Sequence, residues 1–332
     1  MKITRRDCIL SAASLAATMP AEVVALEARG RDVAEEDATT MAGVFTALFT
    51  PFKQDYSLNE EMLERLVEFG IANGVKGFYL TGGTGEGLLM SVEERAKVYK
   101  RVVRAAHGRV NVIAHVGCIR TSDAVSLARA AADAGCDWVS SMPPVYYGVK
   151  PGDILNHYRM ISEATDLPFM IYASNGLVDL ERDARAFDLK NVMGMKYTGT
   201  DFYSVQRLAG RLSKKAVFFS GSDQHMIAAL SFGDLFCGAI GTVQNIVPAK
   251  FVRLFSLMRA NDVRSAASVQ REINRIVETV CHTYPKHSLR KAAMRYIGFD
   301  CGQFRPPHEP YTEEEYRSFA IALAKCIVRQ SV

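Results

Sequence analysis

Long apolar runs and basic runs are both missing from this sequence of 332 residues. Outside the first twenty residues, no stretch approaches the ~20 apolar residues that a membrane-spanning helix needs. The 40 Lys and Arg residues are balanced by 36 Asp and Glu residues, and the formal net charge of +4 is spread along the chain. Because binding to a phosphate backbone depends on clustered positive charge, we expect no nucleic-acid partner, and no membrane contact for the mature protein.

Cysteines are few, seven in all, and their spacing matches no metal-binding motif. We therefore expect no metal site. The six cysteines that follow Cys8 form an even number, which permits disulfides, but Cys118, Cys136 and Cys237 lie in or beside predicted core elements. Buried free thiols are the favoured interpretation for these three residues.

The first forty residues have the pattern of an export signal followed by a linker. Arg5 and Arg6 precede an apolar block at residues 9–19 that is too short and too rich in Ala for a good membrane helix. This setting resembles a twin-arginine signal, although Cys8 stands where Phe or Leu is usual, and cleavage would fall within residues 21–28. We expect a periplasmic or otherwise exported protein, or a cytoplasmic one if the two arginines occur there by chance.

From residue 43 onward, short apolar runs alternate with amphipathic stretches. The runs are apolar at nearly every position, as expected for strands that have helices on one face and a barrel interior on the other. They comprise residues 44–49, 77–80, 112–116, 138–142, 169–172, 192–195, 217–219 and 235–240. Eight such units in roughly 220 residues predict an α/β fold, a (β/α)8 TIM barrel over about residues 43–261.

Helix starts are marked by Ser/Thr-x-x-Glu capping boxes, in which side chains bond to free amides of the first turn. They begin at Ser57, Ser91 and Thr312. Three helical patterns follow the predicted barrel, and no linker rich in Pro, Gly or Ser precedes them. We therefore expect residues 262–330 to form a C-terminal helical extension that packs on the barrel, so that residues 41–332 form one domain after the leader at 1–40.

Catalytic groups of such barrels lie at the carboxyl ends of the strands, which directs attention to polar residues that follow the apolar runs. The sixth run leads to Lys196. Burial at the barrel mouth would lower the pKa of its ammonium and free the amine to attack a ketone, giving a Schiff base. A lysine that extends its ammonium to solvent fits the spacing equally well.

Two other strand ends carry candidate groups. The fourth run leads to Tyr146 and Tyr147, which could relay protons, although packing at the rim is favoured on the pattern alone. The second run opens into a glycine-rich loop at residues 81–87. Its amides and the Thr84 hydroxyl suit a carboxylate, and a simple chain reversal fits equally well. It is not a phosphate-binding P-loop, because no Gly-Lys-Ser or Gly-Lys-Thr follows.

Taken in order, these segments resemble the dihydrodipicolinate synthase and N-acetylneuraminate lyase family of class I aldolases, from about residue 43 to the C-terminus. Further motifs of the family are Thr50-Pro51-Phe52, Gly221-Ser222-Asp223, Gly241-Thr242 and Asn245, which follow the first, seventh and eighth strands. The segments that resemble the sialate lyase branch are residues 113–118, 194–201 and 305–307.

The resemblance implies a role for each matching residue. Lys196 would form the imine with pyruvate, Tyr147 would relay protons, and Gly83 with Thr84 would hold the pyruvate carboxylate. The rest of the substrate would be bound by Thr198, Gly221, Asp223, Gln224, Gly241 and Thr242. No metal or organic cofactor is implied. A homotetramer is expected because tetramers are common among such relatives.

Two further polar residues are expected to be structural. We expect His115 to be a strand residue in the barrel core rather than a base. We expect Glu86 to be a helix-start residue rather than an acid.

The sequence departs from the family pattern at three places. Gly83 stands where Ser or Thr is usual, so a hydroxyl near the tyrosine relay is missing, which could slow proton transfer. Residues 172–175 replace a Tyr-Asn-x-Pro motif and no arginine is near, which counts against dihydrodipicolinate synthesis. Gln224 replaces the second acid of a pair that holds the polyol tail, and an amide keeps hydrogen bonding but not the charge.

The sequence thus predicts a class I aldolase or lyase that cleaves a 2-oxo-3-deoxy sugar acid, N-acetylneuraminate first, into pyruvate and N-acetylmannosamine. One alternative is an aldolase or dehydratase that acts on another 2-oxo acid through the same imine chemistry. The other is a catalytically weakened sugar-acid binding protein, suggested by Gly83. The presence of Lys196 and Tyr147 favours the enzyme.

The leader generates the first testable prediction. Replacing Arg5 and Arg6 together by Lys keeps the charge but removes the guanidinium pair, so precursor should accumulate inside the cell. Fractionation followed by immunoblotting measures this. Unchanged periplasmic recovery of the double variant would refute the twin-arginine assignment.

Overall fold

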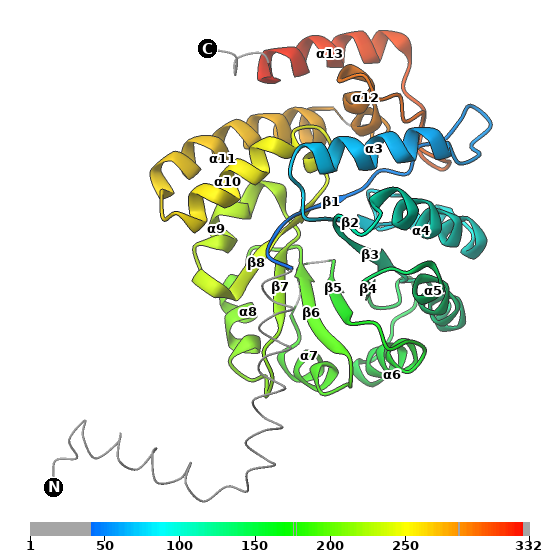
Figure 1. Ribbon diagram of the computed structural model, residues 1–332, viewed down its shortest axis with the longest axis vertical. Coiled ribbons are helices and arrows are strands. Elements are labelled where there is room, and N and C mark those ends of the chain that lie inside the picture. Colours follow the sequence, from blue (N-terminus) through cyan, green and yellow to red (C-terminus); the bar gives the residue numbers. More distant parts are fainter. Residues whose placement is uncertain (1–40, 175, 177, 285, 328–332) are drawn as a thin grey trace, which may run out of the picture. The chain divides into compact units, whose positions relative to one another are not determined.

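The computed structural model describes residues 41–327 apart from 175, 177 and 285, so the predicted export signal lies outside the described residues. Eight parallel strands form a closed barrel in which each strand pairs with its neighbours in sequence and β1 pairs with β8 (Figure 1). They are β1 (Gly43–Ala47), β2 (Gly77–Leu80), β3 (Asn111–His115), β4 (Trp138–Ser141), β5 (Phe169–Ala173), β6 (Val192–Tyr197), β7 (Val217–Ser220) and β8 (Phe236–Gly241). All eight predicted strands are confirmed.

One helix follows each strand and covers the outside of the barrel. These helices are α3 (Glu60–Ala72), α4 (Val92–Ala106), α5 (Thr121–Ala134), α6 (Pro151–Ser162), α7 (Leu180–Phe187), α8 (Phe202–Ala209), α9 (Met226–Leu230) and α10 (Pro248–Arg259). Three more follow them: α11 (Val263–Val277), α12 (Leu289–Tyr296) and α13 (Glu313–Ile327). In Figure 1, α11 lies along α10, and α12 lies with α13 at one end of the molecule. The predicted C-terminal helices are therefore present.

Two of the three predicted capping boxes are confirmed, and one is wrong. Ser91 and Thr312 each exchange hydrogen bonds with the Glu three residues later. The helix predicted at Ser57 instead begins after Asn59, whose side-chain oxygen accepts from the amide of Met62 at 3.1 Å. Ser57 cannot serve as the cap because its hydroxyl and amide both donate to Asp55 in the preceding turn, at 2.6 and 2.9 Å.

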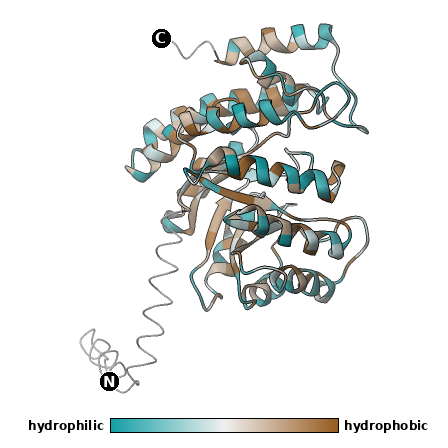
Figure 2. Cartoon of the chain, turned by 45° about the vertical axis from the view of Figure 1, so that its right-hand side comes forward, coloured by the Kyte–Doolittle hydropathy of each residue, from teal (hydrophilic) through white to brown (hydrophobic). Residues whose placement is uncertain are grey.

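The barrel interior is filled with side chains below its carboxyl end. Phe45 and Phe219 pack edge to face across it, with ring centroids 5.1 Å apart. A Cβ at Gly194 would lie 2.8 Å from the side chain of Val217 and 3.4 Å from the ring of Trp138, so this glycine makes room for both. Apolar residues dominate the strands, whereas the helices alternate between apolar and polar faces (Figure 2). Access to the interior is thus restricted to the carboxyl end of the strands.

The three cysteines expected in the core carry free thiols. Cys118 and Cys136 are buried, as predicted, and burial raises the pKa of the Cys136 thiol to about 12. Cys237, near the start of β8, is half-buried, so for this residue the prediction of burial is wrong; its thiol donates to the carbonyl of Phe218 at 3.2 Å.

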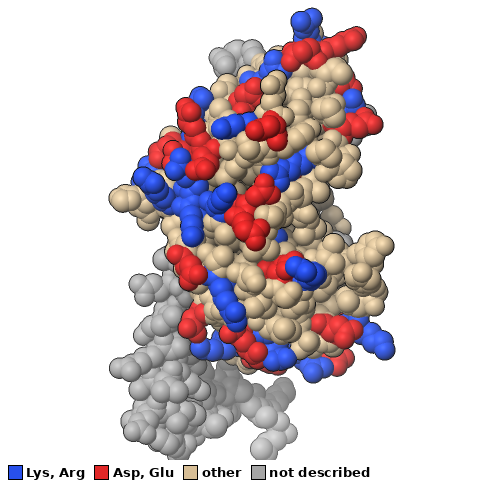
Figure 3. Space-filling model, turned by 90° about the vertical axis from the view of Figure 1, so that its right-hand side faces the viewer, with Lys and Arg blue, Asp and Glu red and all other residues tan. Residues whose placement is uncertain are grey.

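The surface carries both signs of charge. On the face drawn in Figure 3, Lys and Arg are interspersed with Asp and Glu. Within the described ranges, no helix is long and apolar enough to cross a membrane.

A buried ion pair ties the C-terminal segment to the loop after β2. Glu86 adopts a left-handed backbone conformation (φ 56°) before the short turn at Gly87–Leu89. Its carboxylate lies 2.6 Å from the ammonium of Lys291 on α12, and both side chains are buried. The Glu86 carboxylate also accepts from the amide of Arg305 at 2.7 Å. Glu86 is thus a helix-start residue, as predicted, but its charge also has a structural role that the sequence did not indicate.

Removing one partner of this pair should destabilise the protein strongly. Lys291→Met leaves the Glu86 carboxylate buried without its cation, and we expect the free energy of unfolding to fall by about 3–5 kcal/mol. Urea unfolding measures the change. The double variant Glu86→Gln/Lys291→Met should recover part of the loss, because no charge is then left unpaired.

Lys190→Met is the matched control, since Lys190 pairs with Asp166 at 2.9 Å on the exposed surface and its loss should change stability little. An equally small effect of Lys291→Met would contradict the role of the buried pair.

Candidate active site

Lys196 lies near the carboxyl end of β6 with its side chain inside the barrel, and only 5% of the residue is exposed. Its ammonium nitrogen is 4.2 Å from the ring centre of Tyr79 and 4.3 Å from that of Tyr172. Burial lowers the pKa of Lys196, and the charges of Tyr172 and Asp223 oppose this shift only in part. A larger share of the amine is therefore neutral, the form that attacks a carbonyl carbon.

Aromatic side chains from β2, β3 and β5 form the wall around this amine. The rings of Tyr79, His115 and Tyr172 lie in mutual contact, with centroids 5.8 to 6.0 Å apart. The hydroxyl of Tyr79 is 3.0 Å from that of Ser140, and burial raises its pKa well above the ordinary value, so this phenol stays protonated. The ring faces of this wall attract a cation.

His115 is a core strand residue, as predicted. Its Nδ1 lies 3.1 Å from the carbonyl oxygen of Thr81, and because a carbonyl only accepts, Nδ1 carries the proton. Burial lowers the pKa of His115 well below its ordinary value, so the ring is neutral. Its Nε2 is then an acceptor, and it has no partner among the described residues.

The loop after β2 meets the loop after β8. The hydroxyls of Thr84 and Thr242 are 2.6 Å apart, and Thr50 donates to the carbonyl of Gly85 at 2.7 Å. Gly83 is exposed next to them, and no atom lies within 4 Å of where its Cβ would be. The structure therefore brings Thr84, Thr242 and Gly83 together at the barrel mouth, with room for the hydroxyl that Gly83 lacks.

The ends of β6 and β7 also meet. A Cβ at Gly221 would lie 2.0 Å from the hydroxyl oxygen of Thr198, so only glycine allows this approach. The Thr198 hydroxyl is buried and has no hydrogen-bond partner in the described part of the chain. Such a group is available to a ligand.

Asp223 is an acidic group whose charge acts on Lys196. One carboxylate oxygen, Oδ2, accepts from the amide of Val243 at 2.8 Å, while Oδ1 is buried with no hydrogen-bond partner among the described residues. A Cβ at Gly241 would lie 1.8 Å from Oδ1, so the carboxyl group occupies the space that glycine leaves. Burial raises the pKa of Asp223 to about 6. Its unpaired oxygen suits a substrate hydroxyl.

Gln224 and Tyr147 are the predicted site residues that remain. Gln224 is half-buried in the short turn Asp223–His225. Tyr147 is 67% exposed on the loop after β4 and packs edge to face on Tyr146, with ring centroids 5.1 Å apart. The structure does not bring Tyr147 into contact with Lys196. The phenols beside the amine are Tyr79 and Tyr172.

A cavity of about 340 Å³ opens at this end of the barrel. Gly83, His115 and Tyr172 line it, together with Leu88, Leu89, Met142, Ser174, Pro307 and His308, among others. Tyr172 lines the cavity and also contacts Lys196, so one ring separates the cavity from the amine's surroundings.

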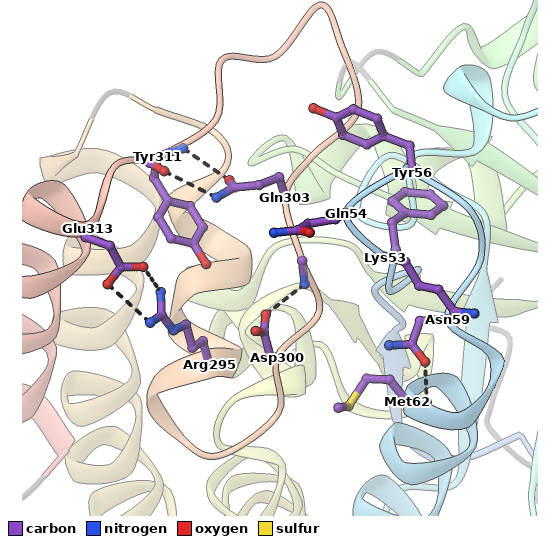
Figure 4. Close-up of a pocket in the computed structure, with 12 residues that line it drawn as sticks. Lys53, Gln54, Tyr56, Asn59, Met62, Arg295, Asp300, Gln303, Tyr311 and Glu313 are labelled. Atoms are coloured by element: carbon purple, nitrogen blue, oxygen red, sulfur yellow. Dashed lines mark hydrogen bonds and ion pairs between the residues drawn. The ribbon is translucent and has the colours of Figure 1, made fainter.

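A larger cavity of about 510 Å³ lies between the loop after β1 and the C-terminal segment (Figure 4). None of the predicted site residues lines it. Its polar groups largely bind one another: Gln303 pairs with the backbone of Tyr311 in both directions, and Arg295 pairs with Glu313. We therefore assign the reaction to the smaller cavity beside Lys196.

Across the described residues, no group of three or more His, Cys, Asp or Glu side chains gathers closely enough to hold a metal ion.

The sequence patterns did not single out Tyr79 and Tyr172 as neighbours of the amine. A signal was present, because Tyr172 is paired in register with Lys196 on adjacent strands and so faces the same side. Counting residues back from the ends of β5 and β6 would have identified Tyr172 as a neighbour of Lys196.

Comparisons with known proteins place this geometry in a family. The model of the dihydrodipicolinate synthetase family matches residues 40–326. N-acetylneuraminate lyase of Rhizobium meliloti (strain 1021) is 30% identical over 287 residues, which cover 86% of this chain and 95% of the relative. N-acetylneuraminate lyase of Escherichia coli (strain K12 / DH10B) is 31% identical over 299 residues, covering 88% of this chain and 99% of the relative.

Solved structures agree. The crystal structure of N-acetylneuraminate lyase from Mycoplasma synoviae has a TM-score of 0.80 at 30% identity and covers 86% of this chain and 98% of that one. The wild-type sialic acid aldolase of Ruminococcus gnavus has a TM-score of 0.81 at 25% identity, with 87% and 99% covered. The chain belongs to the dihydrodipicolinate synthetase family, in the branch that contains the N-acetylneuraminate lyases.

Proposed function

We propose that this protein is a class I lyase that cleaves a 2-oxo-3-deoxy sugar acid through an imine at Lys196. The observation that carries the proposal is the burial of the Lys196 amine at the carboxyl end of the barrel, between two tyrosine rings and beside a cavity of about 340 Å³. The named relatives, which are lyases of N-acetylneuraminate, support the same reaction.

The chemistry starts with attack of the neutral Lys196 amine on the 2-oxo carbon, and loss of water gives a protonated imine. A base then removes the proton of the C4 hydroxyl, and the C3–C4 bond breaks. Its electron pair moves into the imine to give an enamine, and C4 leaves as an aldehyde. Protonation at C3 and hydrolysis release pyruvate and restore the amine.

The loop after β2 supports binding of the carboxylate. Gly83 lines the cavity, and the hydroxyl of the next residue, Thr84, is already bonded to Thr242, which orients it. Backbone amides of such a loop bind an anion well. The family pattern has a hydroxyl-bearing side chain at this position. At Gly83 that space is open, with no atom within 4 Å of where the Cβ would be.

Two phenols are candidates for the proton relay. Tyr147 is assigned to it by the family pattern, and its exposed position requires the loop after β4 to bring the hydroxyl to the imine. Tyr172 is already beside the amine and lines the cavity. We assign the relay to Tyr147 and the positioning of the amine to Tyr172.

The far part of the substrate is assigned to the ends of β6, β7 and β8. The unpaired oxygens of Thr198 and Asp223 suit hydroxyl groups. Gly221 and Gly241 let these side chains reach their positions, as the close Cβ distances indicate. N-acetylneuraminate, cleaved to pyruvate and N-acetylmannosamine, is the first substrate to test.

A second candidate is an aldolase or dehydratase for another 2-oxo acid, and Gln224 favours it. An amide at this position replaces a charged acceptor of the family pattern, which weakens one contact to a neutral polyol. Both candidate functions use the same imine at Lys196.

The remaining assignments concern the whole protein. We propose residues 1–40 as an export signal and linker that direct the protein to the periplasm, ahead of one domain at residues 41–332. We also propose a homotetramer, because tetramers are common among relatives.

A substrate panel tests the proposal. We expect N-acetylneuraminate to be cleaved detectably but with a high KM, because Gln224 has lost the charged acceptor. Gln224→Glu should raise kcat/KM for N-acetylneuraminate about tenfold. Pyruvate release, coupled to a dehydrogenase, measures both values.

Gln206→Glu is the matched control, since it adds the same charge on the exposed face of α8 and should leave kcat/KM unchanged. Robust turnover of a shorter 2-oxo-3-deoxy acid with none on any sialic acid would reject the sialate substrate. No turnover of any 2-oxo acid would reject the lyase.

A further inference from the structure

His308 places a polar ring on the wall of the reaction cavity. It lies in the segment between α12 and α13 and lines the cavity together with Pro307. The residues that resemble the sialate lyases, 305–307, end one position before it, so the sequence gave no reason to choose it. The residue is half-buried. The proposed mechanism leaves this ring without a role.

Packing fixes the orientation of the His308 ring. It stacks on the ring of His287, with centroids 4.9 Å apart and an angle of 12° between the planes. The buried ring of Phe304 contacts it edge-on, with centroids 5.4 Å apart. A side chain that is already held in one orientation loses little conformational entropy when it binds a ligand.

Arg305 anchors the backbone at the start of this segment. Its guanidinium makes two hydrogen bonds with the carboxylate of Glu94, at 2.8 and 2.6 Å. It also donates to the carbonyls of Leu89 and Tyr56, at 3.0 and 2.6 Å. Leu89 itself lines the cavity, and the backbone carbonyl of Arg305 accepts from the amide of His308 at 3.2 Å. His308 therefore has a defined position relative to the rest of the cavity wall.

The hydrogen-bonding groups of the His308 ring are unused. Within the described part of the chain, neither ring nitrogen forms a hydrogen bond, because its contacts are made by the ring face and the backbone amide. A histidine ring has at least one N–H donor in either protonation state. Other polar side chains of the wall are engaged: Thr81 donates to the carbonyl of His115 at 3.0 Å, and Glu86 pairs with Lys291.

Apolar side chains line much of the same cavity. They belong to Leu88, Leu89, Met142 and Pro307. In such a cavity, the few polar groups that are available orient the ligand and provide specificity. An unpaired, oriented imidazole in this wall is suited to one hydroxyl group of a ligand.

We propose that His308 is a substrate-binding residue whose ring hydrogen-bonds to a hydroxyl on the part of the sugar acid that leaves as the aldehyde. This inference rests on the proposed function, which binds the carboxylate at Gly83 on the same cavity wall. The pyruvate part has no polar group left for His308, because its carboxylate is bound there and its 2-oxo carbon is attacked by Lys196. The ring of Tyr172 separates the cavity from the surroundings of the amine, so the hydroxyl is one distant from the reacting carbons.

Condensation of pyruvate with an aldehyde, the reverse of cleavage, tests the proposal, since it gives a separate KM for each part of the substrate. His308→Phe keeps a flat ring for the stack on His287 and removes both nitrogens. We expect the KM for N-acetylmannosamine to rise about tenfold and the KM for pyruvate to stay within about twofold. The KM for D-glyceraldehyde should also stay within about twofold, because its hydroxyls lie close to the reacting carbon.

Two further variants locate the effect. His308→Asn keeps an N–H donor and should recover part of the loss. His282→Phe is the matched control, since it makes the same change at an exposed position and should leave all three KM values unchanged.

The outcomes separate this role from the proposed function. An unchanged KM for N-acetylmannosamine in His308→Phe, an equal rise for all three compounds, or an equal rise in His282→Phe would overturn the role of His308 and leave the lyase standing. If no aldehyde condenses with pyruvate, the proposed function fails.

Binding decides the role of His308 if N-acetylmannosamine does not condense. The dissociation constant of N-acetylneuraminate for Lys196→Met is then measured by calorimetry, with and without His308→Phe. About tenfold weaker binding in the double variant would support the role, and equal values would overturn it.

Discussion

The site depends on one constraint: the Lys196 ammonium lies inside a closed barrel, and no carboxylate of the described residues is bonded to it. Desolvation disfavours the charged form of a buried amine, and the ring faces of Tyr79 and Tyr172 offset this only in part. Lys291 is also buried, but it has Glu86 at 2.6 Å. Two lysines are buried in the part of the chain that the structure describes, and their environments are opposite: Lys291 is held in an ion pair, and Lys196 has no carboxylate bonded to it.

The rest of the barrel end can be understood as support for that amine. Gly194 lets Val217 and Trp138 fill the interior below it, so that substrate reaches it from the carboxyl end only. The contact between Thr84 and Thr242 joins loops from strands that are distant in sequence. The segment between α12 and α13 adds part of the cavity wall through Pro307 and His308. The cavity wall therefore combines loops at the strand ends with the C-terminal segment.

Local patterns predicted most of the fold, and contacts between distant segments explain what they missed. Strand positions follow from apolar runs, and Ser91 and Thr312 cap helices because their partners lie three residues away. The helix after β1 begins at Asn59 instead of Ser57, since Asp55 takes the serine. The buried pair of Glu86 and Lys291 depends on packing of α12 against the loop after β2, which no periodicity reveals. Lys196 could be chosen from its strand end, but its aromatic neighbours follow only from strand register.

Trapping of the imine tests the central claim most directly. Borohydride reduction in the presence of pyruvate, followed by intact mass and peptide mapping, should add one reduced three-carbon unit per chain, on the peptide that contains Lys196. The peptide that contains Lys291 serves as the internal control and should stay unmodified, because its amine is held by Glu86. An adduct on any other lysine, or none at all, would contradict the account.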